Sequence, residues 1–148
     1  MFPKHANYLK AQLLRVYLFD LLILNIDRHI GNWGIVASEE GLNIYIFDNS
    51  LSFISGCPPK LVFNDESRHS KSSDLKGYHH YYPTLNELKY FIENAPLEYI
   101  DILKELYEEL TPEIVEKVFA LYTTGYEQSL QIYMENYEAI GLLLSLKR

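Results

Sequence analysis

Residues 19–53 read FDLLILNIDRHIGNWGIVASEEGLNIYIFDNSLSF, and this stretch decides the fold. It opens inside a pattern that is apolar almost all round, so we expect a helix over residues 8–26 with most of its circumference buried. Residues 33–38 and 42–47 read as two short strands with a glycine in the connection between them, which predicts a β-hairpin. One polar loop therefore precedes the hairpin, and another follows it.

Composition and charge narrow the classes of protein to which this chain can belong. The chain has 148 residues, with 13 Lys and Arg against 20 Asp and Glu, and a formal net charge of −7. That balance argues against binding to nucleic acid or to an anionic membrane, because the phosphates of either would repel it overall. The single cysteine, Cys57, excludes an intramolecular disulfide framework and a zinc site built from cysteines.

The start of the chain does not predict a secretory signal, because Pro3 and Lys4 precede any apolar run. The most apolar stretch, residues 16–26, is interrupted by Asp20 and Asn25. It is also too short to span a membrane, which takes about 20 apolar residues. We therefore expect a cytoplasmic protein that does not contact the membrane.

The remainder of the chain divides into an irregular segment and a helical tail. Residues 54–83 show no sustained period, and a connection of this length inside a domain is usually functional or mobile. From residue 84 onward the pattern predicts four helices. Thr84 followed by Glu87 caps the first, and Thr111-Pro112 opens the third. We expect a single, mainly helical (α+β) domain over residues 1–148 with one small β-hairpin.

The two polar loops carry the residues that can perform chemistry. Asp27 and Asn32 lie in the first loop, and Asp48 begins the second. A buried helix that leads into the first loop, and a hairpin that returns the chain to the second, would bring these three side chains together. Phosphoryl transfer requires a carboxylate that orients a hydroxyl acceptor, with an amide oxygen and a second carboxylate that hold Mg²⁺.

This arrangement resembles a known family of kinases. The segments FDLLILNIDRHIGNWGIV and IYIFDNSLSF look like the catalytic half of the HipA-like kinases. They are also similar to the phosphatidylinositol 3/4-kinases of the atypical branch, whose loops run N-x-D-R-x-x-x-N and D-x-G. The resemblance covers residues 20–53, about a quarter of the chain. The helical tail is compatible with the C-terminal lobe of a kinase but has no signature of its own.

The resemblance implies a protein-kinase-like C-lobe that uses ATP and Mg²⁺. Asp27 would be the catalytic base, while Asn32 and Asp48 would bind Mg²⁺ and, through it, the nucleotide. The substrate would be a protein with a Ser or Thr acceptor, and a toxin–antitoxin setting would add an antitoxin-like protein partner. The domain would then have three parts: catalytic and metal loops over 25–53, an activation-segment-like loop over 54–83, and a helical tail over 84–148.

Two departures from the family pattern bear on activity. Ser50 stands where the family has a glycine, two residues after the metal-binding Asp48. No G-x-G precedes the first loop, and Lys4 and Lys10 belong to a helical stretch without a sheet, so we expect the N-lobe that covers ATP to be absent. By itself this lobe should bind Mg·ATP weakly and transfer phosphate negligibly. It would need an N-lobe from a longer chain or from a partner subunit.

Other functions remain compatible with these residues. A degenerate kinase lobe could serve as a non-catalytic binding or regulatory module. The presence of Asp27, Asn32 and Asp48 favours an enzyme, whereas the missing N-lobe favours the module. A phosphatidylinositol 4-kinase-like lipid kinase fragment is disfavoured by the net charge of −7. A metal-dependent nuclease using Asp27, His29 and Asn32 would need further ligands at a fixed spacing, which the sequence does not show.

Several individual side chains have more than one interpretation. Arg28 could pair with Asp20, with another acid, or with a phosphate. Trp33 at the start of a strand is better read as a core residue than as a nucleotide-stacking one. Four serines of the irregular segment lie beside basic residues and could be phosphorylated, or could belong to an ordinary flexible loop: Ser67, Ser70, Ser72 and Ser73.

Overall fold

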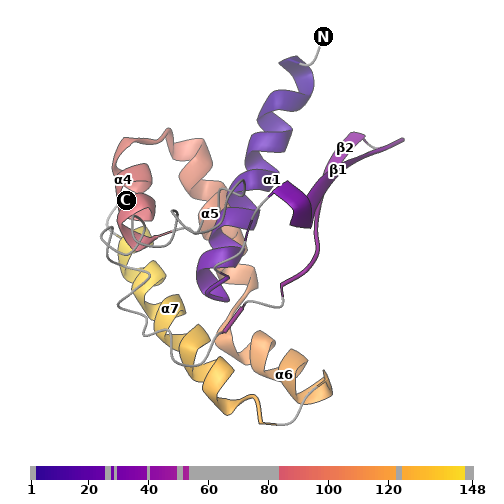
Figure 1. The fold of residues 1–148 in the computed structure, drawn as a ribbon. Coiled ribbons are helices and arrows are strands. Elements are labelled where there is room, and N and C mark those ends of the chain that lie inside the picture. Colours follow the sequence, from indigo (N-terminus) through magenta and orange to yellow (C-terminus); the bar gives the residue numbers. More distant parts are fainter. Residues whose placement is uncertain are drawn as a thin grey trace, which may run out of the picture.

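The computed structural model is mainly helical, with one small antiparallel sheet (Figure 1). It describes residues 3–25, 28, 30–39, 41–49, 52–53, 84–122 and 125–145. The elements are α1 (Pro3–Leu22), the 3₁₀ turn η1 (Ile30–Asn32), β1 (Trp33–Ser38), β2 (Gly41–Ile46), α4 (Leu85–Asn94), α5 (Leu97–Glu109), α6 (Pro112–Tyr122) and α7 (Glu127–Ser145). The predicted mainly helical fold with a small hairpin is confirmed for these residues. The segment 54–83, which contains Ser67, Ser70, Ser72 and Ser73, lies outside them.

Helix α1 begins earlier and ends earlier than the helix predicted over residues 8–26. It ends at Leu22 because Leu24 adopts a left-handed backbone conformation with φ 51°. The N–H of Asn25 then returns to the carbonyl oxygen of Asp20 at 2.9 Å, which is the hydrogen-bond pattern of a Schellman motif. The apolar run continues through this turn, so hydrophobic periodicity alone could not place the end of the helix.

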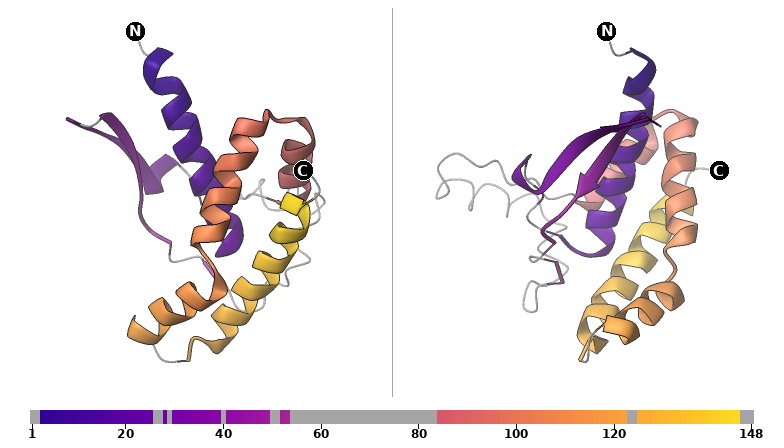
Figure 2. Two further views of the ribbon diagram at one scale, coloured as in Figure 1. Left: turned by 180° about the vertical axis from the view of Figure 1, so that it is seen from behind. Right: turned by 90° about the vertical axis from the view of Figure 1, so that its right-hand side faces the viewer.

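Among the described side chains of α1, the buried ones lie in its last turns. Leu18 and Leu22 have no exposed surface, whereas Tyr8 and Leu13 are 49% and 43% exposed. The first half of α1 extends past the other helices, and the views of Figure 2 show the hairpin on one side of α1 and α5 on the other. The expectation that most of the circumference of this helix is buried is therefore wrong for its first half.

Strands β1 and β2 form the predicted hairpin, with a register that runs from the pair Trp33–Ile46 to the pair Ser38–Gly41. Gly41 has a φ of 133°, a conformation that L side chains rarely adopt, so the turn needs a glycine at this position. The change from a helical period to β-type residues thus correctly located the hairpin.

A side chain of α1 occupies the outer edge of β2. The Gln12 amide nitrogen donates to the carbonyl oxygen of Leu42 at 3.1 Å, and the Gln12 amide oxygen accepts a hydrogen bond from the N–H of Ile44. This amide therefore pairs with β2 as the backbone of a further strand would. The hairpin is held at a defined position beside α1 as a result.

The hydrophobic core lies where the second half of α1 meets α4, α5 and α7 (Figure 1). Its fully buried members include Leu18 and Leu22 of α1, Leu88 of α4, Ile100 and Leu103 of α5, and Tyr133 and Ile140 of α7. Because α1 is anchored in this core, its C-terminal end provides a rigid base for the loops that follow. None of the described helices is long and apolar enough to cross a membrane.

The helical tail begins as its local sequence predicts. The Thr84 side chain accepts a hydrogen bond from the N–H of Glu87, and the Glu87 side chain accepts one from the N–H of Thr84. This reciprocal capping box starts α4. Helix α6 starts at Pro112, and Gly125, with a φ of 73°, lies between α6 and α7. The predicted helix starts at Thr84 and Thr111-Pro112 are confirmed.

Candidate functional site

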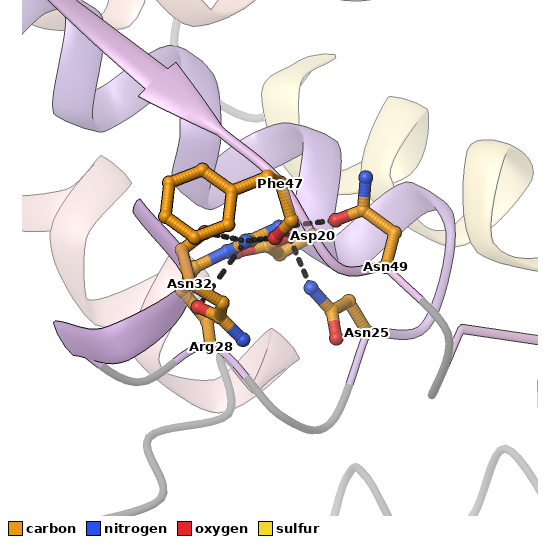
Figure 3. Close-up of polar contacts among 6 residues, drawn as sticks. All are labelled: Asp20, Asn25, Arg28, Asn32, Phe47 and Asn49. Carbon is orange, nitrogen blue, oxygen red and sulfur yellow. Dashed lines mark hydrogen bonds and ion pairs between the residues drawn. The ribbon is translucent and has the colours of Figure 1, made fainter. Parts of the chain in front are cut away.

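A polar cluster built around a buried ion pair joins the end of α1 to the two loops that flank the hairpin (Figure 3). Asp20 and Asn25 come from the end of α1 and the turn after it, and Arg28 comes from the first loop. Asn32 closes η1, while Phe47 and Asn49 follow β2. We call these six residues the Arg28 cluster, because Arg28 lies at its centre and contacts most of the others.

The centre of the cluster is a bidentate ion pair between Arg28 and Asp20. The Nε of Arg28 donates to one carboxylate oxygen of Asp20 at 2.9 Å, and the Nη2 donates to the other at 2.7 Å. Both side chains are buried, with 7% and 2% of their surface exposed. Asn25 donates a further hydrogen bond to the Asp20 carboxylate at 2.9 Å. A buried carboxylate requires such partners, because burial removes the water that would otherwise solvate its charge.

The remaining donors of Arg28 bind acceptors in both loops. The Nη1 approaches the carbonyl oxygen of Asn32 at 3.1 Å, its side-chain Oδ1 at 3.4 Å, and the carbonyl oxygen of Phe47 at 3.3 Å. The Nη2 donates to the Oδ1 of Asn49 at 2.6 Å. Every guanidinium nitrogen thus has a protein acceptor. Of the interpretations left open for Arg28, pairing with Asp20 is the one that the structure bears out.

Backbone hydrogen bonds also link the two loops. The N–H of Phe47 donates to the carbonyl oxygen of Asn32 at 3.0 Å, which continues the ladder of the hairpin by one pair. Phe53 then lies beside the turn that follows α1, since its N–H donates to the carbonyl oxygen of Ile23 at 3.0 Å. The segments that carry Asn32 and Asp48 therefore lie side by side at the end of α1.

The predicted site residues occupy different environments. Asn32 is 2% exposed, and its side-chain oxygen faces Arg28. Asp48 is exposed and has a left-handed backbone conformation with φ 55°, which is uncommon outside glycine and recurs at functional sites. Asp27 lies outside the described residues, as do His29 and Ser50. The convergence of all three side-chain oxygens stays a prediction, whereas the adjacency of the two loops is a finding.

The residue types at this site suit Mg²⁺ better than a softer metal. Mg²⁺ takes oxygen ligands and is commonly held by one or two carboxylates together with substrate phosphates. Asn32 and Asp48 would supply an amide oxygen and a carboxylate of this kind. Among the described residues there is no group of three or more His, Cys, Asp and Glu side chains that could hold a metal without such a co-ligand.

Asn25 and Asn49 complete the cluster, and sequence reasoning assigned a role to neither. A signal was present, because Asp20 lies in an otherwise apolar helix and a buried acid requires both a cation and further donors. Comparisons with protein-family models, with curated proteins and with solved structures found no match to this chain. The resemblance to kinases therefore rests on the motif residues alone.

Proposed function

We propose that this chain is the ATP- and Mg²⁺-dependent phosphotransferase lobe of a HipA-like Ser/Thr protein kinase, acting in the cytoplasm. The observation that carries the proposal is the adjacency of the two loops: the Asn32 carbonyl accepts from Phe47 N–H at 3.0 Å, and Arg28 bonds to both loops. Kinase chemistry depends on such an arrangement, since it consists mostly of positioning and of electrostatic stabilisation of the phosphoryl group.

Each predicted site residue has one task in this function. Asp27 orients the hydroxyl of the acceptor Ser or Thr and takes its proton. Asn32 and Asp48 hold Mg²⁺, which when bound neutralises negative charge on the phosphates of ATP. Arg28 contacts neither substrate, because its N–H donors are directed at protein acceptors.

Exposed apolar side chains on the hairpin support the need for an N-lobe. In the register of the hairpin, Val36, Tyr45 and Phe47 lie on one face, and each is at least half exposed. A group of exposed apolar side chains usually marks a surface that another part of an assembly covers. The N-lobe would come from a longer chain or from a partner subunit, and it would complete the nucleotide site above the two loops. An antitoxin-like protein would be a further partner, whose binding regulates the assembled kinase.

One observation favours a second candidate, a non-catalytic binding or regulatory module. The Arg28 cluster satisfies its own hydrogen bonds, and the buried side chain of Asn32 already contacts Arg28 at 3.4 Å. A lobe with this internal network keeps its shape without a metal or a nucleotide. It could therefore dock to a partner while contributing no chemistry.

The deciding experiment is transfer of radiolabelled phosphate from ATP to a general Ser/Thr protein substrate. It is run on the chain alone, on the chain joined to or mixed with its N-lobe, and on the Asp27→Ala and Asp48→Ala variants of that pair. We expect negligible transfer by the chain alone, transfer by the pair, and loss of that transfer in both variants. Arg15→Ala serves as the control, because Arg15 forms an exposed ion pair with Glu105.

The possible results separate the two candidates. Transfer by the pair that survives Asp48→Ala would refute the assigned metal ligand and with it the mechanism. A pair whose lobes bind each other but transfer no phosphate would favour the non-catalytic module.

A further inference from the structure

We infer that Arg28 is a positioning residue, which locks the loop carrying Asn32 to the segment carrying Asp48 and so sets the affinity of the site for metal. The inference deepens the proposed function and, for its metal readout, rests on it. The coupling of the two loops by Arg28 has its own readout, which needs no ligand.

Arg28 joins one rigidly held residue, Asp20, to acceptors in the two loops. Asp20 is held in place because it is 2% exposed and belongs to the part of α1 that is anchored in the core. The bidentate pair with Asp20 sets both the position and the plane of the guanidinium group. Because that group is planar and rigid, the directions of its remaining N–H bonds are set as well.

The other acceptors of Arg28 lie in the two loops. One is Asn32, whose backbone and side-chain oxygens both face the Nη1 of Arg28. The other is the segment after β2, where the Phe47 carbonyl and the Asn49 side chain accept from Arg28 at 3.3 and 2.6 Å. Asp48 lies between these two acceptors in the sequence, so both neighbours of Asp48 are tied to the same guanidinium group as Asn32.

A lysine could not replace Arg28 in this role. Its ammonium group is compact and carries three donors, whereas the guanidinium group spreads five donors over a plane. An ammonium group that pairs with Asp20 would not reach all the acceptors that Arg28 contacts in the two loops. Arg28→Lys should therefore keep the positive charge and lose the coupling between the loops.

Asn49 offers the sharpest test, because it is exposed while the ion pair beneath it is buried. Asn49→Ala removes the side-chain acceptor of Arg28 in the second loop and leaves the Arg28–Asp20 pair in place. Asn49→Asp restores an oxygen acceptor for Arg28 and is the conservative rescue. Arg15→Ala is the matched control, since it removes a guanidinium group from an exposed ion pair on the same helix as Asp20.

Two measurements are made on each variant. The first is amide hydrogen exchange at Phe47, whose N–H donates to Asn32 across the two loops. The second is the affinity for Mn²⁺, used as a probe for Mg²⁺, in the presence of ATP and of the N-lobe. Outer residues that orient metal ligands typically change metal affinity by about 10- to 100-fold when they are mutated. We expect that loss in Asn49→Ala and Arg28→Lys, together with faster exchange at Phe47.

The thermal unfolding midpoint of Asn49→Ala should stay near that of the unaltered chain, and Asn49→Asp should restore Mn²⁺ affinity to within a few-fold. Unchanged exchange at Phe47 and unchanged affinity in Asn49→Ala would overturn the inference. An affinity that falls only in proportion to global stability, or that Asn49→Asp fails to restore, would also overturn it. If the unaltered assembly binds no Mn²⁺ with ATP while exchange at Phe47 still responds, the proposed kinase function fails and the coupling by Arg28 stands.

Discussion

The side-chain amide of Asn136 donates a hydrogen bond to the carbonyl oxygen of Leu22 at 3.2 Å, although the two residues lie 114 positions apart. Leu22 is the last residue of α1, where carbonyl oxygens lack partners within the helix. Asn136 lies in the middle of α7 and is 3% exposed. Helix α7 therefore caps the helix that leads into the candidate site, which links the stability of the tail to the geometry of the loops.

Asn136→Ala should lower the free energy of unfolding by about 1–3 kcal/mol, because it leaves the buried Leu22 carbonyl without this donor. Urea denaturation measures the change. Asn94→Ala is a matched control, since Asn94 also donates to a helix carbonyl, that of Tyr90, but does so in an exposed position. Equal losses in the two variants would contradict the argument from burial.

Asp20→Ala should cost considerably more than the loss of a surface charge. It leaves Arg28 buried without its carboxylate, and breaking one side of a buried ion pair typically costs about 3–5 kcal/mol. Glu105→Ala removes the partner of Arg15 from an exposed pair and should cost less than about 1 kcal/mol. Chemical denaturation of both variants measures the contrast, and similar costs would mean that Arg28 gains equivalent partners elsewhere.

Local signals in the sequence predicted the parts of the fold that depend on neighbouring residues. The capping box of Thr84 and Glu87 acts across one helical turn, and Gly41 lies within the hairpin that it helps to form. Such features are readable because the interacting residues are only a few positions apart. The end of α1 was missed because Leu24 takes a left-handed conformation for which leucine carries no local signal.

The candidate site could be predicted only in part, for a related reason. The motif residues located the two loops, and the hairpin between them implied that they would meet. The partners of Arg28 depend on how the loops fold back on α1, a tertiary arrangement that no single stretch of the chain encodes. Asp20 was identifiable as an acid in an apolar helix, whereas the acceptor role of Asn49 became evident only from the structure.

Alkaline pH should destabilise the protein in part through Tyr133. Burial raises the pKa of this phenol above its ordinary value of about 10, and neighbouring Tyr137 and Tyr107 raise it further. The unfolded chain therefore loses this proton first as the pH rises. The stability that the neutral phenol contributes is complete below about pH 10 and is lost progressively above it.

Tyr133→Phe tests this dependence. The variant should be less stable at neutral pH by about 1 kcal/mol, because Tyr133 donates a hydrogen bond to the Leu110 carbonyl. Its stability should also fall less steeply above pH 10 than that of the unaltered chain. Urea denaturation at a series of pH values, with tyrosinate absorbance as the titration signal, measures both. Parallel pH profiles for the two proteins would show that Tyr133 does not drive alkaline unfolding.

Substitutions at Asp48 should change stability and function to different extents, because its backbone has a left-handed conformation with φ 55°. Asp48→Gly and Asp48→Ala both remove the carboxylate, but only glycine adopts this conformation without a steric cost. We expect the glycine variant to be more stable than the alanine variant by about 1 kcal/mol, the left-handed penalty less the greater entropy of glycine when unfolded. Asp48→Asn, whose side chain tolerates this conformation, should keep the stability of the unaltered chain.

The affinity for metal should not follow the order of stability among these three variants. If Asp48 holds Mg²⁺, all three lose affinity for Mn²⁺ with ATP in the assembled protein, since none keeps the charge that attracts the metal. Asp48→Asn is the most informative, because it changes the charge while preserving shape and backbone conformation. Denaturation and Mn²⁺ titration of the same preparations measure stability and metal affinity together. An asparagine variant that binds Mn²⁺ as well as the unaltered chain would remove Asp48 from the metal site, whatever the alanine and glycine variants do to stability.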